Sequence, residues 1–127
     1  ARRTERLRAV ALSPQIVAAR PGREGWELLV SRWGRFAGSD LLRTGRDPWA
    51  CVEELVAAAE HVPAPSRMGE AATVEETELI TDWLRSPGVR LVSTSQEGPP
   101  LAYRVAGAHA FALPPGRLSA SDPWNAA

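Results

Sequence analysis

The stretch GWELLVSRWGRF, residues 25–36, interleaves aromatic rings with charged side chains in a pattern that could bind nucleic acid. Aromatic rings stack on bases, and guanidinium groups pair with phosphates. Stacking contributes about 1–3 kcal/mol per base, so a few such contacts already produce measurable affinity. The candidates for nucleic-acid contact in this stretch are Arg32, Trp33 and Arg35.

The same stretch also fits two half-buried strands. Because alternate residues of a strand face opposite sides, Trp26, Leu28 and Val30 share one apolar face. We therefore predict that Trp26 lies in the core. Trp33 precedes Gly34 at a predicted turn, and both packing and base contact are open to it.

Arginines also gather at the N-terminus, in ARRTERLR. On a helix predicted for residues 2–12, Arg2, Arg3 and Arg6 cluster on one side, where they could pair with phosphates. A solvated helix face is the alternative interpretation of these arginines.

No complete catalytic set or metal-ligand set appears in the sequence, and no cofactor is predicted. His61 and His109 stand apart, without the spaced acids or cysteines of a metal site. Cys51, near the start of a predicted helix, would gain some thiolate stabilisation from the helix dipole, but its apolar neighbours favour a small buried hydrophobe. The acids of EETE, residues 75–78, could hold magnesium, although their place in the first turn of a helix explains them without a metal.

Hydrophobic periodicity predicts an α+β fold that positions these residues. The expected elements are a helix over 2–12, a three-stranded antiparallel meander, amphipathic helices over 45–62 and 73–85, and a C-terminal β-hairpin of strands 89–95 and 101–106. The meander comprises 15–20, the opening stretch up to the turn at Gly34, and 35–43. We expect a single domain over residues 1–106 and a weakly structured tail over 107–127.

Both amphipathic helices carry N-terminal signals. Asp47 can cap free amides while Pro48 occupies the first helical position, and this helix is expected to bury its stripe on the sheet. Thr73 and Glu76 have the spacing of a capping box, in which each side chain accepts from the other residue's backbone amide. The helix that follows is expected to bury Leu79, Ile80, Trp83 and Leu84.

Charge is unevenly distributed along the 127 residues, although 15 basic and 15 acidic side chains balance. Up to Arg46 ten arginines stand against four acids, a sum of +6, and from Asp47 onward five arginines stand against eleven acids, a sum of −6. This asymmetry is typical of a chain with one half that faces an anion. Attraction between the two halves within one fold explains it equally well.

Composition excludes several protein classes. Hydrophobic residues at 44% and charged residues at 24% argue against wholesale disorder. No apolar run approaches the about 20 residues that cross a bilayer, and one cysteine cannot form an intrachain disulfide. We expect a cytoplasmic location and no membrane partner, and the absence of an initial methionine fits processing or a fragment of a longer chain.

The run RTERLRAVALSPQIVAARPGREGWELLVSRWGRFAGSDLL, with EETELITDWLRSPGVRLV further on, resembles the C-terminal region of certain bacterial fusion proteins. These proteins join a DEDDh-type exonuclease domain to an excinuclease-C-like GIY-YIG endonuclease segment, and the likeness covers about residues 3–95. In that family the chemistry belongs to the preceding parts: four acids and a His that bind two metals, and the Tyr, Arg and Glu residues of the GIY-YIG fold. None of these motifs occurs in this sequence, so the resemblance transfers no catalytic residue.

The resemblance implies a noncatalytic accessory domain of a DNA-repair or DNA-processing nuclease. Its partners would be DNA, the nuclease domains of the same parent protein, or both, and we expect no catalysis by this chain alone. Two alternatives stay open. A protein-interaction domain without a nucleic-acid role would use the acidic helices and an exposed strand edge. A ribonuclease-H-like nuclease would need acids on adjacent strands, for which the meander offers Glu24, Glu27 and Asp40.

Overall fold

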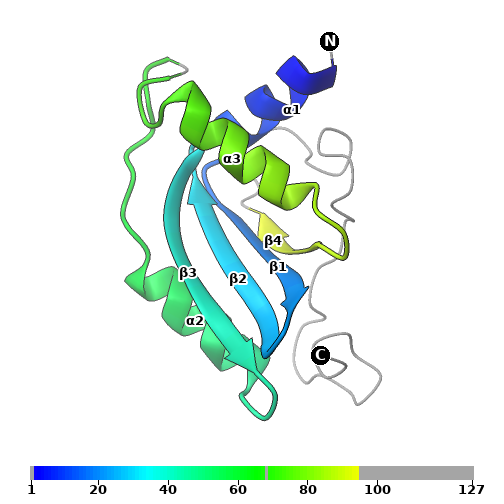
Figure 1. The fold of residues 1–127 in the computed structure, drawn as a ribbon. Helices are drawn as coiled ribbons and strands as arrows, with labels where there is room; N and C mark the ends of the chain where they lie inside the picture. The colour runs from blue at the N-terminus through cyan, green and yellow to red at the C-terminus, as the bar shows by residue number, and fades with distance from the viewer. Residues whose placement is uncertain (1, 68, 95–127) are drawn as a thin grey trace.

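The computed structural model describes residues 2–67 and 69–94 (Figure 1). Its elements follow the chain in the order α1 (Arg2–Ala11), β1 (Ile16–Gly22), β2 (Gly25–Arg32), β3 (Arg35–Arg43), α2 (Pro48–Ala58), α3 (Val74–Leu84) and β4 (Arg90–Thr94). The predicted α+β class is confirmed, with its N-terminal helix, meander, two amphipathic helices and the strand near residue 90. The predicted strand over 101–106, its hairpin and the tail over 107–127 lie outside the described residues.

The four strands form one antiparallel sheet in the order β3-β2-β1-β4. Strands β1, β2 and β3 make the predicted meander, with Ala18 opposite Leu29 and Leu28 opposite Asp40. Strand β4 pairs with the far side of β1, where Ile16 lies opposite Thr94. Strand β3 is therefore an edge of the sheet, with β2 as its one neighbour among the described strands.

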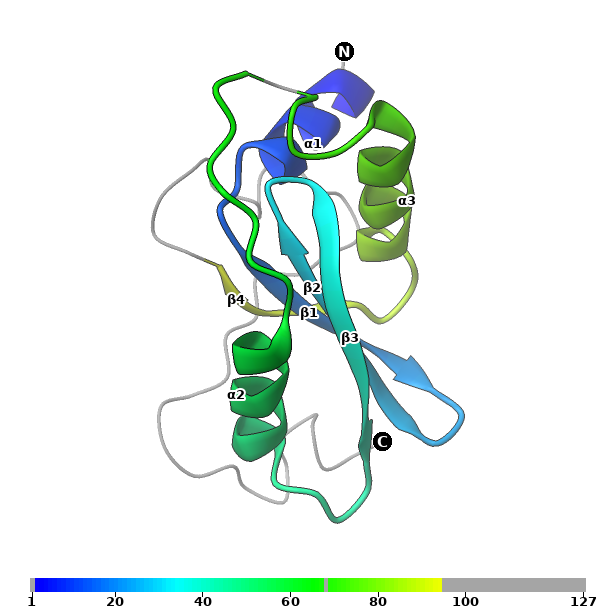
Figure 2. The ribbon, with the colours of Figure 1, turned by 90° about the vertical axis from the view of Figure 1, so that its left-hand side faces the viewer.

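Helices cover both faces of the sheet, α2 on one side and α1 with α3 on the other (Figure 2). Trp26, Leu28 and Val30 point to the α2 side, and Trp26 is only 6% exposed, so its predicted place in the core is confirmed. Leu29 belongs to a second core beneath α1 and α3. The sequence pattern predicted one apolar face for this strand. In the structure β2 is packed on both faces, because helices lie on each side of the sheet.

Helix α2 begins as predicted and ends early. The carboxylate of Asp47 accepts the Trp49 amide at 3.2 Å, and Pro48 opens the helix. The last helical residue is Ala58, short of the predicted end at residue 62. The chain leaves the helix in an extended conformation at Ala59, and the Glu60 amide then bonds to the Ala37 carbonyl of β3 at 2.8 Å.

Helix α3 carries only half of the predicted capping box. The Thr73 hydroxyl accepts the Glu76 amide at 3.1 Å. The Glu76 carboxylate accepts the backbone amide of Phe36 on β3, at 3.0 Å, in place of the Thr73 amide. This acid therefore ties α3 to the edge of the sheet.

The turn between β2 and β3 is held by α3 and by the segment that follows α1. Trp33 and Gly34 have φ values of 55° and 77°, and positive φ at both central residues is what a tight type I′ hairpin turn requires. The Gly34 carbonyl accepts the Thr77 hydroxyl of α3 at 3.1 Å, and the Trp33 amide donates to the Ser13 carbonyl after α1 at 2.9 Å. A Cβ on Gly34 would lie 2.7 Å from the Thr77 hydroxyl oxygen, so the site requires glycine for space as well as for backbone angle.

Helix α3 crosses only one end of its face of the sheet, and the far ends of β2 and β3 extend beyond it (Figure 1). Within the described part of the chain, no helix has the length and apolar character needed to cross a bilayer.

Candidate functional site

The arginines predicted for nucleic-acid contact do not share one surface. Arg3 pairs with Glu78 of α3 and lies 3.9 Å from Asp82, so α1 is held to α3 by charge. The Glu78 carboxylate, by hydrogen bonding and charge, raises the pKa of the Arg3 guanidinium. Arg6 is half-buried on the same helix, and the structure describes the backbone of Arg2 but not its side chain.

Arg32 points to the other side of the molecule and closes the end of α2. Its guanidinium donates to the carbonyl oxygens of Val56, Ala59 and Glu60 at 3.0, 3.2 and 2.8 Å. Two further bonds, of 3.0 and 2.8 Å, reach the side-chain oxygen of Gln15. The last carbonyls of a helix have no partner within the helix, and a cation there also complements the helix dipole. All the donors of this side chain are thus engaged inside the chain.

Arg35 is also engaged internally. It pairs with the Glu60 carboxylate at 3.1 Å and donates to the Ala71 carbonyl at 3.4 Å. Trp33, in the turn beside it, is half-buried. The six residues predicted to bind nucleic acid stay a prediction, and three of their guanidinium groups already have protein partners.

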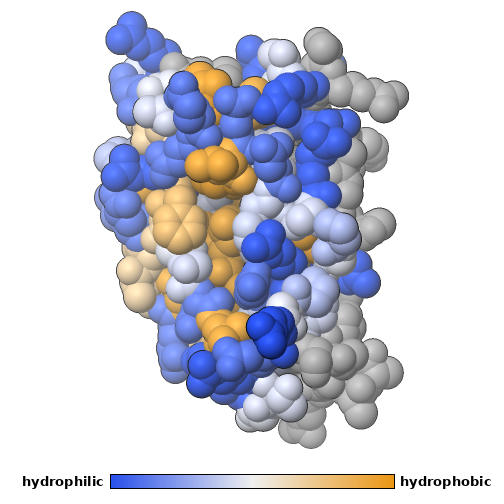
Figure 3. All heavy atoms as spheres, in the orientation of Figure 1, coloured by the Kyte–Doolittle hydropathy of each residue, from blue (hydrophilic) through white to orange (hydrophobic). Residues whose placement is uncertain are grey.

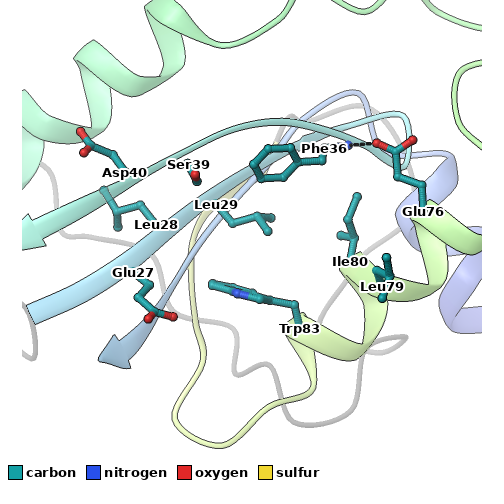
Figure 4. Close-up of a pocket in the computed structure, with 10 residues that line it drawn as sticks. All are labelled: Glu27, Leu28, Leu29, Phe36, Ser39, Asp40, Glu76, Leu79, Ile80 and Trp83. Atoms are coloured by element: carbon teal, nitrogen blue, oxygen red, sulfur yellow. Dashed lines mark hydrogen bonds between the residues drawn. The ribbon is translucent and has the colours of Figure 1, made fainter. Parts of the chain in front are cut away.

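An apolar groove of about 460 Å³ lies between α3 and the open part of the sheet. We call it the α3–β3 groove. Its lining comes from β2, β3 and α3: Glu27, Leu28, Leu29, Phe36, Ser39, Asp40, Glu76, Leu79, Ile80 and Trp83. Side chains of Phe36, Leu29, Ile80 and Trp83 surround the hollow, while Asp40 points away from it (Figure 4).

Two large apolar side chains on this groove are exposed. Phe36 is 45% exposed and Leu79 is 71% exposed, so the prediction that α3 buries Leu79 is wrong. Leu79 stays exposed because α3 crosses the sheet near one end, so that Leu79 lies on the open groove. Hydrophobic surface consequently gathers in the middle of this face, bordered by hydrophilic side chains (Figure 3). An exposed apolar surface inside a polar rim is typical of an interaction site.

Most charged side chains around the groove have partners within the chain. Glu27 pairs with Arg20 at 2.6 Å, and the Arg20 guanidinium stacks 4.7 Å above the Trp83 ring. This cluster ties β1, β2 and α3 together at one end of the groove. At the other end Glu76 accepts a backbone amide and has no ion pair with any described residue.

The edge of β3 borders the groove and is partly closed. The Phe36 amide is held by Glu76, and the carbonyl of Ala37, the extra residue at a β-bulge, is held by the Glu60 amide. Farther along, the Leu41 amide donates to its neighbour Asp40 at 2.7 Å and the Leu41 carbonyl accepts Arg46 at 3.3 Å.

These bonds show which backbone groups of β3 point away from β2. The backbone amide and carbonyl of Leu41 point away from β2. Because this orientation alternates along a strand, the amide and carbonyl of Ser39, two residues earlier, point away from β2 too. No residue within 2–67 or 69–94 bonds to them. The edge is therefore open at Ser39, next to the groove.

The remaining polar candidates do not assemble. Glu27 points toward the groove, whereas Asp40 points to the α2 side, where its carboxylate accepts the Cys51 thiol at 3.6 Å (Figure 4). Glu24 pairs with Arg43 at 3.7 Å. Over the described ranges no three His, Cys, Asp or Glu side chains are close enough to hold a metal ion.

Cys51 is fully buried, as predicted. Burial raises the pKa of its thiol to about 11, an effect that Arg46 opposes and Asp40 reinforces. Removal from water is the largest cause of this shift, and it favours the neutral thiol over the thiolate. His61 is exposed, and His109 lies outside the described residues.

Comparison with known proteins gives one informative similarity. The chain is 38% identical over 112 residues to a protein of Mycobacterium tuberculosis (strain CDC 1551 / Oshkosh) provisionally named as a bifunctional exonuclease/endonuclease. The match takes in 85% of this chain but only 17% of that protein, so the chain spans about a sixth of the length of its relative. No protein-family profile matches the chain, and no solved structure matches it. The similarity links the chain to a nuclease-associated protein.

Proposed function

We propose that this chain is a noncatalytic accessory domain of a DNA-repair or DNA-processing nuclease in the cytoplasm, and that it contacts the nuclease part of its parent protein. The observation that carries the proposal is the match of 112 residues to 17% of a protein named for two nuclease activities. A segment of this size has the dimensions of one domain beside a larger remainder.

The groove favours contact with protein over contact with DNA. Its floor is apolar, Phe36 and Leu79 are its exposed apolar members, and Glu76 lies at its rim. Nucleic-acid interfaces are strongly positive, because phosphate neutralisation dominates their affinity. Arg3, Arg32 and Arg35 are held by groups of this chain, which leaves Arg6, among the described side chains, as the predicted arginine best placed for DNA.

The second candidate, a protein-interaction domain without any nucleic-acid role, rests on the same engaged arginines. A binding experiment separates it from the first. Fluorescence anisotropy with labelled single-stranded and duplex DNA would be measured between about 50 and 200 mM salt, where phosphate contacts lose affinity steeply. If α1 contacts DNA, Arg6→Ala weakens binding and reduces the salt slope by about 1, whereas Arg23→Ala, at an exposed turn, does not.

A cleavage assay on the same DNA with Mg²⁺ or Mn²⁺ tests the noncatalytic part of the proposal. We expect no cleavage by the wild-type chain. Metal-dependent cleavage that copurifies with the chain and is lost in Asp40→Ala would contradict it and would restore the ribonuclease-H-like alternative. Absence of DNA binding at the lowest salt would remove DNA from the proposed partners and leave the nuclease part.

A further inference from the structure

The α3–β3 groove and the open edge at Ser39 form one continuous site. We propose that this site receives an extended peptide segment, which adds a short strand to β3, inserts one apolar side chain into the groove and places a basic side chain near Glu76. The inference rests on the proposed function, in which the segment comes from the nuclease part of the parent polypeptide.

The backbone of β3 supports strand addition over a short length. Ser39 presents an outward amide and carbonyl, while Glu76 and Glu60 close the edge on one side and Asp40 and Arg46 close it on the other. Natural sheets block their edges in this way against uncontrolled pairing. Here the closure stops beside the groove, and the backbone groups of one residue stay available there.

The groove provides the side-chain half of the recognition. In strand addition, main-chain bonds supply affinity and adjoining pockets for alternate side chains supply specificity. The hollow of about 460 Å³ next to Ser39 is large enough for a leucine- or phenylalanine-sized side chain. Phe36 and Leu79 are the exposed surfaces that such a side chain would cover.

Charge favours a basic segment. Helix α3 carries Glu75, Glu76, Glu78 and Asp82 and no basic residue within its bounds. Arg3 forms an ion pair with Glu78 and lies close to Asp82. Glu75 and Glu76 have no ion pair with any described residue. Two copies of this site would bring like charges together, which favours a basic segment over a second copy of the chain.

The experiment is a titration of the ¹⁵N-labelled chain with a synthetic peptide, followed by amide chemical shifts. The probe is acetyl-Thr-Arg-Leu-Arg-Thr-amide, and the matched control replaces both arginines by glutamate. We expect the arginine peptide to shift the amides of Ser39 and Leu79 and to weaken with added salt. The glutamate peptide is expected to bind at least tenfold more weakly.

Two pairs of variants locate the site. Leu79→Arg places a charge in the groove and is expected to weaken binding about tenfold or more, whereas Val74→Arg, also exposed on α3 but outside the groove, is expected to have no effect. Ser39→Pro removes the outward amide and should abolish the shifts, whereas Ser39→Thr keeps the amide and should preserve them. Circular dichroism and thermal unfolding of each variant confirm that it is folded.

Three results would overturn the proposal: no shift with the arginine peptide, binding by Leu79→Arg and Ser39→Pro that equals binding by the wild-type chain, or dimerisation of the free chain that Leu79→Arg abolishes. Peptides of about 12 residues that tile the Mycobacterium tuberculosis relative outside the matched 112 residues then test the source of the segment. If the arginine peptide binds at Ser39 and no tile does, the peptide site stands and the proposed nuclease contact fails.

Discussion

We predict that Arg32 stabilises the fold and that its replacement lowers the free energy of unfolding. Its guanidinium bonds to the carbonyls of Val56, Ala59 and Glu60 and to Gln15. Hydrogen bonds to a charged group contribute about 1.5–3 kcal/mol each when a partner is removed from a buried site. Because this end of α2 is partly exposed and water can replace some of the bonds, we expect Arg32→Ala to lower the free energy of unfolding by about 2–3 kcal/mol in total.

Arg32→Lys keeps the charge but cannot reproduce the planar fork, and a loss of about 1–2 kcal/mol is expected. Unfolding in urea, followed by tryptophan fluorescence, measures these values. With an unfolding entropy of about 2.1 cal/mol/K per residue, a 2 kcal/mol loss lowers the Tm of a chain of 127 residues by about 7 °C. Arg23→Ala is the matched control and should change stability by less than about 0.5 kcal/mol.

The opposite result would support a role for Arg32 in nucleic-acid binding. If Arg32→Lys and Arg32→Ala both leave the urea midpoint unchanged and weaken DNA binding, the guanidinium serves a ligand and the internal bonds are incidental. If stability falls as expected and DNA binding by the folded variants is unchanged, Arg32 acts only on the end of α2.

Three further predictions concern stability. Burial raises the pKa of the Cys51 thiol from 9.0 in the unfolded chain to about 11, so the thiol is neutral in both states below pH 9. The free energy of unfolding should therefore fall by at most about 2.7 kcal/mol as pH rises from about 9 to 11. Urea titrations across this range should show no such fall for Cys51→Ala. Gly34→Ala should destabilise by about 2 kcal/mol or more, from its positive φ and its collision with Thr77, while Gly45→Ala, with positive φ and open space, should cost about 1 kcal/mol; equal Tm shifts would contradict the collision. Asp47→Ala should remove the α2 cap and cost about 1 kcal/mol, whereas Asp47→Ser should cost less, as measured by thermal unfolding.

The elements were predictable because their signals are local. Alternation placed Trp26 in the core, and Asp47 with Pro48 marked the start of α2. The pairing of β4 with β1 was not predicted, since strand order depends on contacts between segments far apart in sequence.

The candidate site was less predictable, because the partners of its charges are set by tertiary packing. Glu76 has the spacing of a capping box, yet its carboxylate reaches Phe36, 40 positions earlier in the chain. Arg32 and Arg35 look like phosphate ligands in the sequence and instead meet the end of α2 and Glu60. The groove left one sequence signal, the apolar stripe of α3 with Leu79 at its side, but a stripe does not reveal how much of itself the sheet will cover.

The short open length of β3 has a consequence for how firmly anything can bind there. One residue offers two main-chain hydrogen bonds, each contributing about 0.5–1.5 kcal/mol, and one apolar side chain adds about 1.5–3 kcal/mol. Because the entropy of association must be subtracted from these contributions, a free peptide would be held no more tightly than roughly the millimolar range. The same segment on a tether within one polypeptide meets an effective concentration of about millimolar, enough to keep the contact formed for much of the time and still let it open. Such a surface suits the internal joints of a multidomain protein better than the capture of a freely diffusing partner.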